Sequence, residues 1–145
     1  MEQFNHVSLL VIEPDLNKRP EAHAIEYYTN LGYSVHKNTK SERGKPDFTI
    51  LQNSEIQFFV EVKSNNDPIA PQQFEWFIKN KEKPIIIFYV KYDKELITLK
   101  KQVKTAIRYD PNNTERLKKI IEKNPKIINL LSRHEKNRVI KILNQ

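Results

Sequence analysis

The 145-residue sequence contains no cysteine, and no apolar run approaches the roughly 20 residues that a membrane-spanning helix needs. The absence of cysteine excludes disulfide frameworks and thiolate metal sites, and it fits a reducing compartment. The N-terminal segment Met1–His6 is acidic and polar, unlike a secretory signal peptide. We therefore expect a soluble, intracellular protein of the cytoplasm.

Several catalytic patterns are also missing. The chain has only two glycines, far apart, so it cannot form a Gly-rich phosphate loop, and it has no Gly-x-Ser-x-Gly elbow. Four scattered histidines show no metal-ligand spacing: His6, His23, His36 and His134. Any chemistry is therefore expected from acidic and basic side chains.

Charge is abundant and unevenly distributed. The formal net charge is +7; residues 1–90 hold 10 Lys/Arg and 12 Asp/Glu, whereas residues 91–145 hold 15 and 6. The positive excess therefore lies entirely in the last third of the chain. This distribution favours contacts between residues 91–145 and an anionic partner such as nucleic acid, and the alternative is a solvated face that keeps the protein soluble.

Two neighbouring apolar segments carry charged residues. Asp47 heads one run, and Glu61 and Lys63 lie within the next, residues 56–63. Side chains alternate along a strand, so Glu61 and Lys63 point the same way. A hairpin loop at residues 52–55 brings Asp47 beside Glu61, at the strand spacing of about 4.8 Å. The alternative is a surface ion pair between Glu61 and Lys63, with Asp47 as a turn residue.

This arrangement predicts a magnesium or manganese site. Two hard carboxylates, Asp47 and Glu61, with water and the carbonyl of Val62, supply the oxygen ligands these ions prefer. Mg²⁺ also binds phosphate oxygens, which points to phosphodiester chemistry. Lys63 can orient or deprotonate the attacking water, or neutralise charge on the phosphate.

Periodicity and turn residues predict an α/β domain. Pro20 suits a helix start and Gly32 the position after its end, and Pro71 opens a second helix. The continuous apolar run at residues 84–90 is typical of a strand buried on both faces. The expected strands are 6–12, 33–37, 48–51, 56–63 and 84–90, and the expected helices are 20–31 and 71–79.

The first helix places an acidic residue on its apolar stripe. Glu21 shares that stripe with Ala24, Ile25, Tyr28 and Leu31 when residues are set 100° apart. Glu21 is therefore either a partner of the helix dipole or a functional carboxylate.

The C-terminal region is harder to assign. Residues 96–109 fit either a strand followed by a helix or one irregular segment. A helix is expected at 115–123, and Pro125 is expected to open the last helix, with apolar residues at multiples of four.

Two segments resemble the PD-(D/E)XK nuclease superfamily, in particular archaeal Holliday junction resolvases and virus-type replication–repair nuclease domains: Gly44-Lys45-Pro46-Asp47-Phe48 and Phe59-Val60-Glu61-Val62-Lys63-Ser64. In that group a glutamate eleven residues before a Gly–aromatic pair often joins the metal site, and Glu21 stands eleven residues before Gly32-Tyr33. A glutamine after a Ser-Pro-like helix start is also common. Gln73 fits that position better than Gln72, with Ala70 in place of serine.

The resemblance covers about residues 20–92 and implies a restriction-endonuclease-like fold, a mixed central sheet flanked by helices. It implies a single nuclease domain, residues 1–145, whose core is about 20–92 and whose basic, mainly helical extension is about 93–145. The implied catalytic residues are Glu21, Asp47, Glu61, Lys63 and Gln73, and the implied metal ligands are Glu21, Asp47, Glu61 and Val62.

The implied activity is Mg²⁺-dependent endonuclease cleavage of DNA, with Mn²⁺ able to substitute. The resemblance includes enzymes of branched DNA such as Holliday junctions, in recombination, repair or replication, while the residues leave duplex, flap and single-stranded DNA, and RNA, open as substrates. A homodimer is expected because a nuclease of this size usually cuts two strands as a pair. Two alternatives are a catalytically inactive nucleic-acid-binding module on the same scaffold, and basic helices that bind a protein of a repair assembly.

Overall fold

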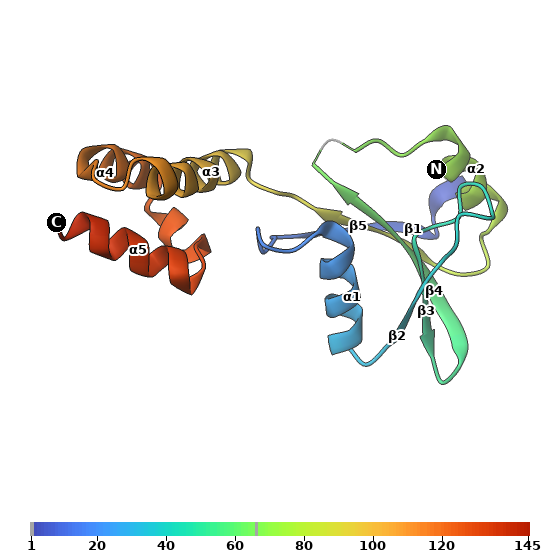
Figure 1. Ribbon diagram of the computed structural model, residues 1–145. Coiled ribbons are helices and arrows are strands. Elements are labelled where there is room, and N and C mark those ends of the chain that lie inside the picture. Colours follow the sequence, from blue (N-terminus) through green and yellow to red (C-terminus); the bar gives the residue numbers. More distant parts are fainter. Residues whose placement is uncertain (1, 66) are drawn as a thin grey trace. The chain divides into compact units, whose positions relative to one another are not determined.

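The computed structural model describes residues 2–65 and 67–145, and Figure 1 shows its course. The chain divides into two compact units, Met1–Tyr92 and Asp93–Gln145. The division falls at the end of the expected nuclease core. No helix in the described part of the chain is both long and apolar enough to cross a membrane.

The first unit is built on a five-stranded mixed sheet. Its strands are β1 (Val7–Ile12), β2 (Ser34–Lys37), β3 (Phe48–Gln52), β4 (Glu55–Ser64) and β5 (Ile85–Val90). They lie in the order β1-β5-β4-β3-β2, with β5 parallel to both neighbours and the β2–β3 and β3–β4 pairs antiparallel. The α/β class and the mixed central sheet are therefore confirmed.

The register of the β3–β4 hairpin determines which residue of β4 lies opposite Asp47. Its two-residue turn places Asn53 and Ser54 at φ 53° and 64°, the left-handed region that a tight hairpin turn requires. Phe48 pairs with Val60, so one further step along the same register puts Asp47 opposite Glu61.

Helices cover the two faces of the sheet. On one face, Ala24 and Tyr28 of α1 (Pro20–Asn30) pack over a core that includes Phe48, Val60 and Phe88. On the other face, α2 (Pro71–Lys79) and the short 3₁₀ helix η1 (Glu2–Phe4) meet a smaller cluster of Trp76, Phe77 and Ile85. Phe59 belongs to this second cluster, so Glu61 and Lys63, on the same side of β4, lie on the α2 face.

The apolar stripe expected on α1 is wrong at two positions. Ile25 is 43% exposed and Leu31 is 57% exposed. The buried face instead includes His23, whose Nε2 accepts a hydrogen bond from the Asp15 N–H at 2.8 Å, while its Nδ1 bonds the Arg19 carbonyl at 2.9 Å. Because both ring nitrogens are hydrogen-bonded, the imidazole can be buried, and the buried face of α1 includes His23 and leaves Ile25 exposed.

The second unit is helical and has its own core. It contains α3 (Lys94–Tyr109), α4 (Thr114–Lys123), the 3₁₀ helix η2 (Pro125–Leu130) and α5 (Arg133–Leu143). Its buried cluster consists of apolar residues from all parts of the unit: Leu99, Val103, Ala106, Ile107, Leu117, Ile120, Ile127, Leu131, Val139 and Ile142.

Two expectations for this region are wrong. Residues 94–109 form one helix because the Asp93 carboxylate accepts hydrogen bonds from Glu95 N–H and Leu96 N–H, which caps the start. Pro125 opens a 3₁₀ helix rather than the last α-helix. The backbone becomes extended at Leu131 (ψ 149°), and Ser132 caps a new helix with Glu135.

Candidate active site

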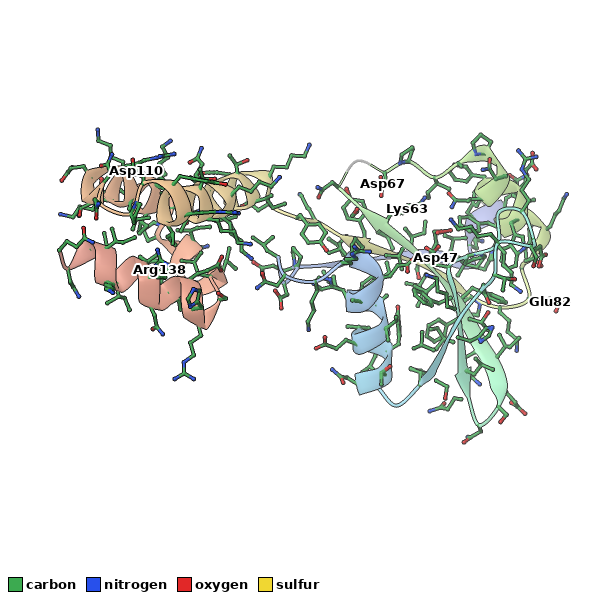
Figure 2. All side chains as sticks on the ribbon, viewed as in Figure 1. Asp47, Lys63, Asp67, Glu82, Asp110 and Arg138 are labelled. Atoms are coloured by element: carbon green, nitrogen blue, oxygen red, sulfur yellow. The ribbon has the colours of Figure 1, made fainter. Side chains whose placement is uncertain are left out.

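Asp47 and Glu61 are brought together at the junction of β3 and β4. The Oδ2 atom of Asp47 accepts a hydrogen bond from the Val62 N–H at 2.8 Å, which directs the carboxylate toward β4. Glu61 is only 2% exposed. Figure 2 labels Asp47, just before β3 begins, and Lys63, near the end of β4.

The two carboxyl groups interact strongly. The pKa of Glu61 is raised to about 9, chiefly by burial and further by a side-chain hydrogen bond to Asp47 and by the charge of Asp47. The charge of Lys63 lowers this pKa and that of Glu21 raises it. At neutral pH, Glu61 therefore carries a proton when no cation is bound, because a charged carboxylate is costly when it is buried beside a second carboxyl group.

Gln73 supports Glu61 from the first turn of α2. Its Nε2 donates a hydrogen bond to Oε2 of Glu61 at 3.0 Å, and its Oε1 accepts one from the Ala70 N–H at 2.8 Å. The amide is therefore held at both ends, and its orientation is fixed by the start of the helix. The structure brings Gln73 to the carboxyl pair.

Glu21 and Lys63 lie at the border of this group. Glu21 lines a cleft of about 430 Å³ together with Asp47, Glu61 and Gln73. It also lines a neighbouring hollow of about 350 Å³, and that hollow contains Lys63 and Val62. Glu21 is 44% exposed and forms an ion pair with Lys37 at 3.1 Å. It therefore links the carboxyl pair to the side on which Lys63 lies.

The donor set fits a hard cation with an incomplete protein shell. Among residues 2–65 and 67–145, no three His, Asp or Glu side chains are placed to hold a metal ion together. A cation here would therefore rely on Asp47 and Glu61 plus main-chain oxygen and water, as Mg²⁺ does when it keeps part of its hydration shell. A divalent cation can also replace the proton that buried Glu61 holds, so these residues fit such an ion.

The cleft has a basic wall that the sequence motifs did not reveal. Its lining includes Lys37, Lys40, Arg43 and Lys45, from the end of β2 and the segment between β2 and β3. One sequence signal could have indicated this wall: four Lys or Arg residues lie within residues 37–45, close to Gly44 and just before Pro46-Asp47. Only the fold shows that this segment borders the carboxyl pair.

The comparisons with known proteins agree with this geometry. The family model of the VRR-NUC domain matches residues 3–91, which include every expected site residue. The chain belongs to the VRR-NUC domain family. These virus-type replication–repair nuclease domains are PD-(D/E)XK-like, so the suspected superfamily is confirmed. The family supports a nuclease-type function in replication or repair. No match was found among curated proteins or among solved structures.

Proposed function

We propose that this VRR-NUC protein is a metal-dependent endonuclease that hydrolyses DNA phosphodiester bonds. The observation that carries the proposal is the carboxyl pair of buried Glu61 and half-buried Asp47, held by the Val62 N–H and by Gln73. Burying an acid beside a second carboxyl group is costly without a cation, which supports a divalent cation site here.

Each side chain has a role in this proposal. Asp47 and Glu61 hold the cation, Mg²⁺ or Mn²⁺, with the Val62 carbonyl as a further ligand. Glu21 lines the same cleft but is not placed to share an ion with the pair, so as a ligand it would have to move or act through a bound water. The bound cation neutralises charge on the phosphate and makes water a better nucleophile. Gln73 fixes the orientation of Glu61, and Lys63 orients or deprotonates the attacking water or offsets phosphate charge.

The second unit is proposed to hold the DNA backbone. Residues 93–145 carry 14 Lys/Arg and 6 Asp/Glu, a balance of +8. Contacts of this kind give affinity and orientation without reading sequence. Branched DNA such as a Holliday junction is the proposed substrate, and a symmetric homodimer would present two sites to its two strands.

A cleavage panel tests the function. Labelled branched, linear and single-stranded DNA are incubated with Mg²⁺ or Mn²⁺ and each variant. Asp47→Asn and Lys63→Ala should lower the rate by about 10²–10⁴-fold and leave binding largely intact, because each removes a group that acts on the reacting atoms. Lys81→Ala, an exposed lysine outside the cleft, is the matched control for Lys63→Ala.

Two outcomes oppose the proposal. Cleavage by Asp47→Asn and Lys63→Ala at the wild-type rate would show that the assigned residues are not catalytic. DNA binding by the wild-type protein without cleavage of any substrate would favour the catalytically inactive module.

A further inference from the structure

The segment between β2 and β3, residues 38–46, is here called the cleft loop. It borders the cleft that contains Asp47 and Glu61, and it contributes Lys40, Arg43 and Lys45 to the lining. Lys45 is paired with Glu42 at 3.7 Å. Lys40 and Arg43 take part in no ion pair with any residue in the described part of the chain. Two uncompensated cations therefore line a cleft that also holds buried carboxyl groups.

The ends of the cleft loop are tied together by Asn38. Its main-chain N–H donates to the Asp47 carbonyl at 2.8 Å, and its Nδ2 donates to the Pro46 carbonyl at 2.9 Å. Its Oδ1 accepts a hydrogen bond from the Thr49 hydroxyl at 2.8 Å. The loop therefore closes directly on the residue that presents the Asp47 carboxylate.

The middle of the loop is fixed against the start of α2. Gly44 has φ +81°, and a Cβ atom on it would lie 2.1 Å from the Gln72 carbonyl oxygen and 3.2 Å from the Gln73 nitrogen. No residue with a side chain fits such a close approach without movement. The loop therefore packs against the same turn that positions Gln73 on Glu61.

A third anchor uses the acidic residue of the loop. The Oε1 atom of Glu42 accepts a hydrogen bond from the indole N–H of Trp76 at 3.0 Å, and Trp76 is only 6% exposed. Glu42 is therefore engaged by Trp76 and Lys45, and it leaves Lys40 and Arg43 uncompensated. A nine-residue loop without secondary structure would ordinarily be mobile, whereas this one, residues 38–46, has anchors at both ends and in the middle.

We propose that the cleft loop is a phosphate-binding site, in which Lys40 and Arg43 hold backbone phosphates next to the bond to be cut. The inference rests on the proposed function and adds the way in which the substrate strand is placed over Asp47 and Glu61. A guanidinium fork suits phosphate oxygens, and a lysine supplies a compact positive charge. Because the loop is anchored, the main chain that carries the two cations is fixed before the nucleic acid arrives, so little main-chain freedom is lost on binding.

The test measures binding separately from cleavage. A Lys63→Ala background, which is expected to bind without cutting, receives Lys40→Ala and Arg43→Ala together. Affinity for a short fluorescent DNA duplex is measured across a range of salt concentrations, without divalent metal. The matched control, Lys81→Ala with Lys83→Ala, removes two exposed cations outside this cleft.

Removing two phosphate-binding cations should reduce the slope of log affinity against log salt by about 1.8 and weaken binding roughly 10- to 30-fold near 0.15 M salt. The control pair should leave the slope near its parental value, and melting temperatures should remain equal. In the wild-type background, KM should rise while kcat changes little, because the cations act on bound backbone rather than on the reacting atoms.

A slope that falls equally in the loop variant and the control overturns the phosphate-binding site, as does an unchanged slope in both. These results are distinct from failure of the proposed function, which is judged by cleavage with the wild-type protein. Wild-type cleavage with an unchanged loop slope removes only the loop from the binding surface. Reduced loop binding in a protein that never cleaves supports the phosphate site and removes the nuclease activity.

Discussion

Gln73 donates its amide N–H to Glu61 at 3.0 Å while its own carbonyl oxygen is held by the Ala70 N–H. This places a neutral side chain against a buried acid and ties that acid to the first turn of α2. A glutamine fixed in this way can stabilise either the protonated or the charged form of Glu61, because its amide hydrogen points at the carboxyl oxygen. The Gln73–Glu61 hydrogen bond predicts that cleavage depends on the side chain at position 73.

Gln73→Ala should lower cleavage about 10- to 100-fold and raise the Mg²⁺ concentration needed for half-maximal rate, because outer partners of metal ligands set ligand orientation. Cleavage rate as a function of Mg²⁺ concentration measures both effects. Gln72→Ala is the control, since Gln72 lines the same cleft but has no hydrogen bond to Glu61 among those of the described residues. Equal behaviour of the two variants would show that the Gln73–Glu61 bond has no part in the activity.

Glu61 should also control stability against pH in the metal-free protein. Its pKa is about 9 in the folded state against an ordinary value of 4.5, so the folded protein holds a proton that the unfolded chain releases. The stability that protonated Glu61 contributes is complete below pH 4.5 and is lost as the pH rises through about 9. The free energy of unfolding should therefore fall by up to about 1.4 kcal/mol per pH unit from this group.

Urea unfolding in chelator at about pH 6 and about pH 8 checks this expectation. Glu61→Gln removes the titrating group, so its stability relative to the wild type should increase with pH. Glu55→Gln, an exposed change on the same strand, should leave the wild-type pH dependence unaltered. A wild-type pH dependence that Glu61→Gln leaves intact would contradict the assigned burial of this acid.

Much of the first unit could be predicted because local signals and tertiary packing agree there. Pro20 and Gly32 mark α1, which ends at Asn30 with Gly32 at φ +94°, and the apolar run before Lys91 forms the buried strand β5. Period-two alternation on β4 placed Glu61 and Lys63 on one face. The hairpin brought Asp47 next to β4, and a shift of the register between Ile50 and Leu51, which the sequence did not reveal, put it opposite Glu61.

The remaining features depend on contacts that periodicity does not encode. The β2–β3 segment looked like a polar loop, and only its anchors on Pro46, Gln72 and Trp76 bring its cations to the cleft. In the C-terminal region, the capping carboxylate of Asp93 decides that one long helix forms. The exposed Ile25 shows the same limit, since hydrogen bonds to the ring of His23 allow the other side of α1 to be buried.

Deleting residues 93–145 should leave the first unit folded and weaken its DNA binding. The two units have separate buried clusters, so the deletion removes a whole core rather than part of one. The slope of log affinity against log salt should flatten by about 0.9 for each phosphate that the shortened protein no longer binds. A cut at residue 114 would be a poorer experiment, because it would expose Leu99 and Val103 of α3.

Thermal unfolding and fluorescence of Trp76 establish whether the shortened protein is folded before its binding is measured. A folded protein with the full-length salt slope would remove the C-terminal unit from the DNA-binding surface. The result does not depend on whether DNA is cut, since binding can be measured without divalent metal.

The two glycines offer a matched pair of substitutions. Gly32 and Gly44 both have positive φ, but a Cβ on Gly32 would meet no atom within 4 Å, whereas one on Gly44 would lie 2.1 Å from the Gln72 carbonyl oxygen. Gly32→Ala should cost about 1 kcal/mol of stability from backbone strain alone. Gly44→Ala should cost about 2–4 kcal/mol, because the clash adds to the strain.

The two glycine variants also distinguish a loss of stability from a loss of activity. Gly44→Ala has to displace the cleft loop or the first turn of α2, and that turn carries Gln73, so single-turnover cleavage should fall at temperatures where the variant remains folded. Gly32→Ala should cleave at nearly the wild-type rate under the same conditions. Urea unfolding gives the stability of each variant. Equal losses of activity in both would mean that the close approach of Gly44 to α2 does not position the site.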